Sequence, residues 1–267
     1  SSDLFNKLRT TDDLPEVIYA REYDAAISPN GNIPVHAFNL ISPTFFANSS
    51  TGNKYSLWVN VYGVSERYLN VYGEKDLRAQ MNQFFHRTYT HPVDGTTLDM
   101  KMLCNWYWYD ETAILETGKG TKDWNFYRYA ETLLSAAEAI AQSSGVNAEA
   151  AGYLAQVKAR ANMEGKDVST IASELQRLGK QAFIEECWKE RLREFPLEMK
   201  IWDDCVRTGK FPQISATNKG EVQFVDLIGA KNGSGATFKA TDLYWPIPVN
   251  EIQRNPNLTQ NEGYSAK

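Results

Sequence analysis

The sequence is poor in the residues that most often carry metal binding and disulfide bonding. Its 267 residues include three cysteines and three histidines, and no two cysteines have C-x-x-C spacing. An odd number of cysteines gives no complete disulfide framework. His36, His86 and His91 show neither H-E-x-x-H nor another metal-ligand spacing. We therefore expect no metal site and no cofactor, and we expect the histidines to form loop or surface hydrogen bonds.

A long apolar run and an excess of basic residues are also missing. No apolar stretch is long enough to span a membrane, and 28 Lys and Arg against 33 Asp and Glu give a net charge of -5. This balance, without a basic stripe, argues against nucleic-acid binding. The chain has no signal peptide and starts at Ser1 without an initiator Met. We expect that a signal was removed or that the chain comes from within a longer protein.

Motifs for common enzyme active sites are absent as well. The sequence contains no G-x-S-x-G, no phosphate-binding loop and no dinucleotide fingerprint. Carboxylates are abundant, with adjacent pairs at Asp110-Glu111 and Asp203-Asp204. Neighbours on a helix point in different directions, so the second pair is poorly suited to acid–base catalysis. We predict a protein that is not an enzyme.

The sequence does have many aromatic side chains within an ordinary globular composition. Hydrophobic residues make up 42% and charged residues 23%, while seven Trp, 14 Tyr and 12 Phe amount to 12%. A chain of this length can bury a core without disulfides. Trp and Tyr fill cores, and they also form flat platforms for ligands that have an apolar face.

The first part of the chain, residues 1–123, is predicted to be rich in loops and to face a ligand. Clusters of Gly, Pro, Asn and Ser interrupt its short apolar segments. Residues 17–20 fit a strand. Residues 76–85 are predicted as a short helix with Leu77, Met81 and Phe84 on one face.

The middle of the chain has a strong helical pattern. Apolar residues recur at helical spacing from Phe126 to Ala141 and again from Ala150 to Ala161. Gly145 suits the end of the first helix and Asn147 the cap of the second, so the two predict an antiparallel hairpin.

A second helical hairpin is predicted to follow. A third helix, capped by Ser169, extends to Phe195, and after Pro196 a fourth runs from about Leu197 to Gly209. Cys187 and Cys205 lie on these helices, where cysteine usually acts as a small hydrophobic residue. The charge cluster 190–194 is interpreted as a helix face that anchors neighbouring loops, with Glu186–Lys189 and Glu190–Arg193 pairs.

These elements predict a mainly α fold. We expect tetratricopeptide-like α-α hairpins with extensive irregular loops and a few short strands, although the repeat is degenerate. Residues 124–267 are expected to form a helical region with a packed tail.

The C-terminal tail, residues 243–264, is too apolar for a free end. Pro246 and Pro248 favour an extended backbone, and Asn250 can cap a single helical turn that ends at Asn255-Pro256. We expect the apolar residues of this tail to pack back onto the helices; they are Tyr244, Trp245, Ile247, Ile252 and Leu258.

Aromatic residues in the loop-rich part are the candidate ligand contacts. Sugar rings present apolar C–H faces to aromatic planes and hydroxyls to polar side chains. In a strand, alternate members of the run 106–109 would face opposite sides, leaving two rings for a ligand. Core packing is the competing interpretation for each ring. The predicted ligand-binding residues are Tyr55, Trp58, Tyr62, Trp106 and Trp108.

Four segments resemble the C-terminal half of the SusD/RagB family, glycan-binding lipoproteins of the outer membrane of Bacteroidetes. They are Asn125–Glu138, with its Arg-Tyr-Ala-Glu, Glu190–Glu194 with Glu198, Trp202–Gly209, and the tail from Trp245 to Tyr264. Met199, Ile201 and Cys205 depart from the family pattern, which indicates a divergent member.

The resemblance implies a tetratricopeptide-like scaffold and a place on the outer-membrane surface. It also implies membrane association through an N-terminal lipid anchor that this chain lacks, and partnership with a SusC-like TonB-dependent transporter. The function it implies is non-catalytic capture of an oligosaccharide or polysaccharide for delivery to that transporter. The alternatives are a helical-repeat scaffold that binds protein or peptide, and a glycoside hydrolase fragment with two facing carboxylates.

Overall fold

The computed structural model describes residues 16–24, 26–27, 64–90, 95–107, 109–110, 122–196 and 198–265. The chain divides into two compact units. The first comprises residues 1–199 and 214–222, and the second comprises residues 200–213 and 223–267. Tyr55, Trp58, Tyr62 and Trp108 of the predicted site lie outside the described residues.

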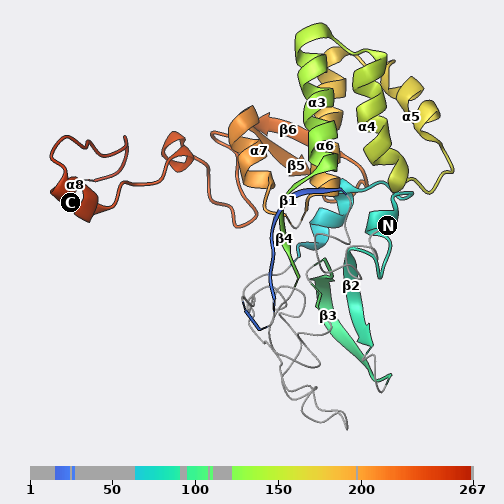
Figure 1. The fold of residues 1–267 in the computed structure, drawn as a ribbon, viewed down its shortest axis with the longest axis horizontal. Helices are drawn as coiled ribbons and strands as arrows, with labels where there is room; N and C mark the ends of the chain where they lie inside the picture. Colours follow the sequence, from blue (N-terminus) through green and yellow to red (C-terminus); the bar gives the residue numbers. More distant parts are fainter. Residues whose placement is uncertain are drawn as a thin grey trace. The chain divides into compact units, whose positions relative to one another are not determined.

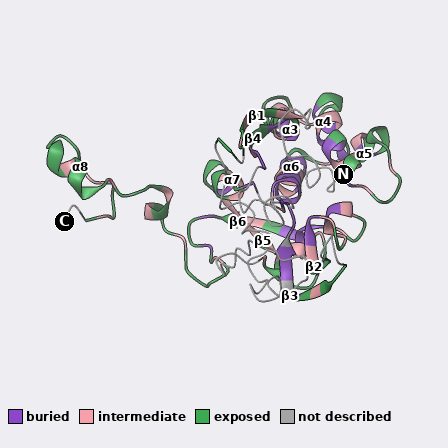
Figure 2. Cartoon of the chain, turned by 60° about the horizontal axis from the view of Figure 1, so that its bottom comes forward, coloured by how far each residue is buried: buried purple, intermediate pink, exposed green. Residues whose placement is uncertain are grey.

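Four helices that pack side by side form the scaffold of the first unit (Figure 1). They are α3 (Tyr129–Ser144), α4 (Ala148–Arg160), α5 (Val168–Leu175) and α6 (Lys180–Glu194). Helix α3 packs against α4 and α6, and α4 packs against α5. Their buried residues lie on the faces that these helices turn toward one another (Figure 2). This arrangement confirms the predicted mainly α, tetratricopeptide-like fold.

The first hairpin has the predicted caps. Gly145 ends α3 with a φ of 80°, which suits a residue without Cβ, and the Asn147 side chain accepts a hydrogen bond from the Ala150 amide. Leu134, Ala137 and Leu154 are fully buried between the helices. Small alanines at this contact allow close approach of the two backbones.

The predicted third helix is wrong in two details. It is broken into α5 and α6, because Gly179 takes an extended conformation and serves as the N-cap of α6. The cap of α5 is Asp167, which accepts a hydrogen bond from the Thr170 amide, whereas the Ser169 hydroxyl donates to Asp167. A carboxylate is a favourable N-cap because it accepts hydrogen bonds from the free amides of the first turn. Its negative charge also interacts favourably with the positive end of the helix dipole.

Three sheets of two strands each accompany the helices. Strand β1 (Val17–Arg21) pairs with β4 (Trp124–Arg128), and β2 (Phe85–Thr90) pairs with β3 (Thr97–Asn105). Strand β5 (Lys210–Ile214) pairs with β6 (Val222–Asp226). The strand predicted at residues 17–20 is confirmed, but Phe126 lies in β4 and not in the helix that follows.

The helix predicted over residues 76–85 is wrong. This stretch contains a short 3-10 turn, η4 (Leu77–Ala79), after η3 (Glu66–Val71), and β2 begins at Phe85. The Asp76 carboxylate accepts from the Arg78 amide, and the Leu77 amide donates to the Ala161 carbonyl. One of these hydrogen bonds goes to a side chain and the other to the carbonyl that follows α4. They take the place of the helical backbone hydrogen bonds that the apolar spacing suggested.

The second unit has a small aromatic core. Helix α7 (Ile201–Thr208) ends at Gly209, whose φ is 65°. Phe238 packs against Trp202 and Phe211, with ring centroids 5.8 and 5.3 Å away. The predicted fourth helix is therefore present, but it starts later than residue 197.

The tail closes on itself through polar side chains. After η6 (Ala240–Leu243) comes α8 (Val249–Arg254), with Pro248 as its N-cap, so Asn250 lies inside the helix and does not cap it. Gln260 donates to and accepts from the backbone of Ile247, and Asn261 donates to the Trp245 carbonyl. Trp245 and Tyr244 are 87% and 62% exposed, so the packing predicted for these two rings is wrong.

Replacing Gly263 in the tail tests this closure. Gly263 has a φ of 86°, and a Cβ there would overlap the Thr241 side chain. Gly263→Ala is expected to open the tail and to speed hydrogen exchange over residues 245–264, with little effect on the first unit. Gly233→Ala is the matched control, because nothing lies within 4 Å of its added Cβ. Equal exchange in both variants would show that the tail is not held by this contact.

No helix in the described ranges combines the length and the apolar character needed to cross a membrane.

Candidate functional site

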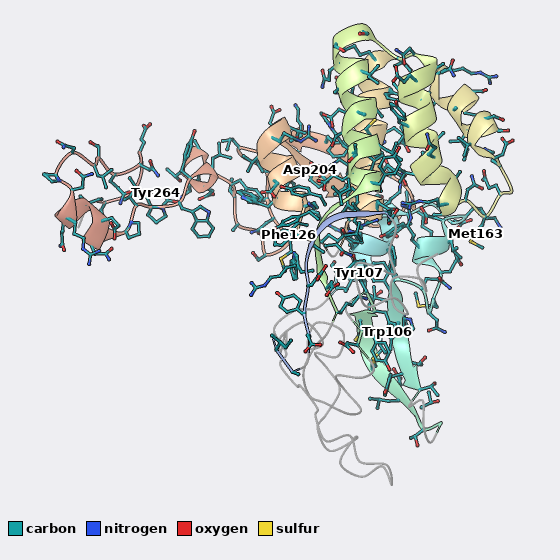
Figure 3. The ribbon with its side chains drawn as sticks, viewed as in Figure 1. Trp106, Tyr107, Phe126, Met163, Asp204 and Tyr264 are labelled. Atoms are coloured by element: carbon teal, nitrogen blue, oxygen red, sulfur yellow. The ribbon has the colours of Figure 1, made fainter. Side chains whose placement is uncertain are left out.

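Three aromatic rings lie together on the exposed side of the β1–β4 ribbon. Tyr19 stacks with Phe126 at 5.4 Å between ring centroids and with Tyr127 at 6.5 Å, and the interplanar angles are 26° and 28°. Tyr19, Phe126 and Tyr127 are 59%, 40% and 56% exposed. Figure 3 shows Phe126 beside this ribbon. We call these three residues the aromatic platform; exposed apolar groups of this kind are typical of binding surfaces.

The ribbon is irregular at the platform and pinned at its ends. The register shifts on both sides of Tyr19, and such bulges re-aim side chains. At one end the Tyr129 amide donates to the Glu16 carbonyl, and at the other the Tyr23 amide donates to Asp123 Oδ1 at 2.9 Å. The platform therefore belongs to a fixed backbone.

Arg128 joins this ribbon to α6. Its side chain is 1% exposed, and it contacts Glu16 at 2.6 Å, Glu194 at 3.2 Å and Glu198 at 2.6 Å. Both guanidinium Nε and Nη2 donate to Glu198, which makes a bidentate pair. Burial alone would lower the pKa of Arg128, but the charges of Glu198 and Glu194 raise it well above its usual value.

A second buried ion cluster surrounds Glu190 on α6. Its side chain is 1% exposed and lies 2.9 Å from Arg78, 3.1 Å from Arg193 and 3.7 Å from Lys158. Burial by itself would raise the pKa of Glu190, but the Arg78, Lys158 and Arg193 charges hold it well below its usual range. The two clusters share Glu194, which pairs with both Arg78 and Arg128.

These clusters decide the interpretation of the charge run at 190–194. It does anchor neighbouring segments, and the predicted Glu190–Arg193 pair is confirmed. The predicted Glu186–Lys189 pair is wrong, because Glu186 pairs with Lys158 of α4 and with Arg193 of its own helix.

Trp106 is the one predicted ligand contact that the structure describes. Strand β3 ends at Asn105, so the strand alternation predicted for residues 106–109 is wrong. The Trp106 ring is 7% exposed and stacks with His86 at 4.0 Å and with Tyr109 at 4.6 Å between ring centroids. Two rings so near one face of an indole would overlap, so they cover its opposite faces. Its role in ligand binding stays a prediction, and a ligand would reach only its edge.

The aromatic platform was missed because Phe126 fits the apolar spacing of the following helix. The available signal was the run Trp124–Arg128, in which aromatic residues favour a strand. Tyr19 gave no local signal, since it joins the platform only through pairing between segments about a hundred residues apart.

The cysteines are buried thiols: Cys104, Cys187 and Cys205 form no disulfide bond. Burial raises the pKa of Cys104 and of Cys205 to about 11, which disfavours the reactive thiolate. This agrees with the small hydrophobic role predicted for Cys187 and Cys205. Within the described ranges, no three His, Cys, Asp or Glu side chains form a group that could hold a metal ion.

Comparison with known proteins decides the family. A family model described as the SusD family matches residues 47–264. The chain belongs to the SusD family. Over 138 residues it is 36% identical to the starch-binding protein SusD of Bacteroides thetaiotaomicron, a match that covers 52% of this chain and 21% of that protein. The resemblance predicted from the sequence is confirmed.

Solved structures of SusD relatives share the fold. A SusD superfamily protein from Parabacteroides distasonis has a TM-score of 0.78 at 27% identity, over 97% of this chain and 53% of that one. Surface glycan-binding protein A from Bacteroides thetaiotaomicron, in complex with laminarihexaose, has a TM-score of 0.62 at 20% identity, over 97% and 54%. The chain therefore spans about half the length of these solved relatives.

The motifs that carried the SusD resemblance have structural roles. Arg128 of the Arg-Tyr-Ala-Glu segment holds Glu194 and Glu198, and Glu131 pairs with Arg191 at 3.0 Å. The tail motif closes the C-terminal segment. These residues build the scaffold, so the motifs identify the family without placing a ligand.

Proposed function

We propose that this chain is part of a non-catalytic glycan-binding protein and that its aromatic platform contacts the sugar. The platform carries the proposal, because flat rings accept the C–H faces of pyranose rings while tyrosine hydroxyls can bond the ring substituents. The names of the relatives support the ligand class: one is a starch-binding protein, and another was solved with laminarihexaose.

The wider proposal concerns the whole protein. It would sit on the outer-membrane surface through an N-terminal lipid anchor and deliver oligosaccharide to a SusC-like TonB-dependent transporter. Its support is membership of the SusD family. Co-purification of the full-length protein with such a transporter from solubilised outer membranes is the expected result, and recovery of the protein without it would count against delivery.

Removing the Tyr19 ring tests the platform. Isothermal titration against glycans that include maltohexaose and laminarihexaose is expected to find at least one ligand. Tyr19→Ala is expected to weaken the binding of that ligand by about tenfold, since the loss of an aromatic contact costs roughly 1 kcal/mol or more of binding free energy. Tyr127→Ala is expected to act in the same direction.

Tyr244→Ala is the matched control, because Tyr244 is 62% exposed but lies in the tail. It is expected to keep wild-type affinity. Equal affinity of Tyr19→Ala, Tyr127→Ala and wild type would remove the platform from the site. Silence across all glycans, with binding to unstructured peptides, would favour the helical-repeat scaffold instead.

A further inference from the structure

An Asn-Gly pair lies in the loop that follows β6, in the second unit. Asn232 precedes Gly233, and residues 233–237 are exposed to solvent. The base of the loop is closed, since the Phe238 amide donates to the Ala230 carbonyl at 2.9 Å. Neither the aromatic platform nor the packing of the helices uses this pair.

Three donors converge on the side-chain oxygen of Asn232. The amides of Ser234 and Ala236 donate to Asn232 Oδ1 at 3.1 and 3.0 Å, and the Ser234 hydroxyl donates to the same atom at 2.8 Å. A hydrogen bond to a charged acceptor is about twice as strong as one to a neutral acceptor. The loop therefore favours a reaction at Asn232 Cγ that places negative charge on this oxygen.

The nucleophile available for such a reaction is the next backbone nitrogen. In the described part of the chain, neither the Gly233 amide nor Asn232 Nδ2 has a hydrogen-bond partner. The hydrogen bond from the Ser234 amide to Oδ1 closes a ring of atoms that contains both Asn232 Cγ and the Gly233 nitrogen. The turn thus keeps the two reacting atoms in the same small ring, and glycine has no Cβ to shield its own nitrogen.

We propose that this loop promotes the spontaneous conversion of Asn232 to isoaspartate and aspartate. Hydroxide removes the Gly233 amide proton, and the nitrogen attacks Asn232 Cγ, so that a C–N bond forms and Oδ1 takes the negative charge. The Cγ–Nδ2 bond then breaks, the nitrogen leaves as ammonia with a proton from water, and a five-membered succinimide ring remains. Water opens the ring at either carbonyl. Asparagine and one water thus give one acid and one ammonia, with no oxidant or reductant.

The products change the loop in charge and in backbone length. Either acid adds one negative charge, and isoaspartate also adds a methylene group to the backbone between Asn232 and Gly233. Phe238, at the base of the loop, packs against Trp202 and Phe211. Conversion to isoaspartate is therefore expected to loosen the aromatic core of the second unit. Aspartate is expected to keep the turn, because its carboxylate can accept the same hydrogen bonds.

Peptide mapping of the purified chain tests the proposal. The chain is kept at pH 8 and 37 °C and then cleaved after glutamate in mild acid, which releases Asn232 within the fragment 222–251. We expect a gain of one mass unit at Asn232, with isoaspartate identified by electron-transfer dissociation. The reaction is expected to be about tenfold or more slower at pH 6, because the attacking nitrogen must lose its proton. An Asn232 that stays intact at pH 8 would overturn the proposal.

Two other asparagines in the same digest serve as internal controls. Asn162 and Asn218 precede larger residues, Met163 and Lys219, whose side chains shield the following nitrogen. Both are expected to stay unchanged while Asn232 reacts. Conversion of all three at one rate would mean general hydrolysis of asparagine and would also overturn the proposal.

Two variants locate the reaction in this loop. Gly233→Ala is expected to slow it about tenfold or more, and the fold should persist because nothing lies within 4 Å of the added Cβ. Ser234→Ala removes one donor to Oδ1 and is expected to slow it about threefold, because that hydrogen bond strengthens as charge develops. Ser173→Ala, on α5, is the matched control and should react like the wild type. A Ser234→Ala chain that reacts as fast as the wild type or faster would refute assistance by the loop.

Hydrogen exchange measures the consequence for the second unit. Chains that carry isoaspartate at position 232 are expected to exchange faster over residues 229–238 than the Asn232→Asp variant, which has the same charge without the added methylene. Equal exchange in the two would refute the effect on the aromatic core. The proposal does not rest on glycan binding, so Tyr19→Ala is expected to leave the conversion rate unchanged.

Discussion

Arg128→Met is expected to lower the free energy of unfolding by about 3–5 kcal/mol, because it leaves buried carboxylates without their shared cation. Arg128 holds Glu16, Glu194 and Glu198, and its own side chain is 1% exposed. It also lies over the Phe195 ring, with Cζ 5.0 Å from the ring centroid. Urea unfolding followed by circular dichroism measures the loss.

Arg87→Met is the matched control for this loss. Arg87 makes a bidentate pair with Glu66, but both side chains are about half exposed. Such exposed pairs contribute about 0–1 kcal/mol. Arg128→Lys is expected to fall between the two, since it keeps the charge and loses the bidentate geometry. A cost for Arg128→Met no larger than for Arg87→Met would mean that the buried carboxylates find other partners.

The protein is expected to lose stability progressively as the pH falls below about 5. Burial alone would raise the pKa of Glu16, Glu186 and Glu190, but their Arg and Lys neighbours lower it in the folded state. The unfolded values are near 4.3, so the folded chain binds fewer protons. Their stabilising contribution is therefore complete above the unfolded pKa and is lost as the pH falls through the folded pKa.

Urea titrations at several pH values measure this dependence. The free-energy cost of losing several buried ion pairs together is comparable with the total free energy of unfolding of a protein, which is about 5–15 kcal/mol. Glu190→Gln is expected to be less stable at pH 7 and to show a shallower decline in acid. Glu185→Gln, on the same helix and without an ion pair among the described residues, should follow the wild type. Parallel curves for Glu190→Gln and wild type would exclude Glu190 as a source of the acid sensitivity.

The helical scaffold was predictable because its signals are local. Apolar residues at helical spacing bury Leu134 and Leu154, and Gly145 and Asn147 mark the ends that periodicity alone leaves open. Where a second local signal competed, the prediction failed. Asp167 took the cap expected of Ser169, and an extended Gly179 split a helix whose apolar pattern continues across it.

The candidate site was much less predictable, since it depends on segments distant in sequence. Tyr19 meets Phe126 and Tyr127 only because β1 pairs with β4. Trp106 has the composition of a ligand platform, yet neighbouring rings cover its faces. Composition gives the chemistry of a ring but not which of its faces remains open.

The sequence by itself determined the family, the α-helical hairpins and their caps, because these rest on periodicity and short motifs. Only the tertiary structure decided which charges are buried and which rings are exposed. Arg78, Arg128 and Glu190 read as ordinary surface residues until helix packing removes their water, pairs Arg78 with Glu190 and makes both arginines partners of Glu194. The aromatic platform arises in the same way, from side chains that the fold brings together across about a hundred residues.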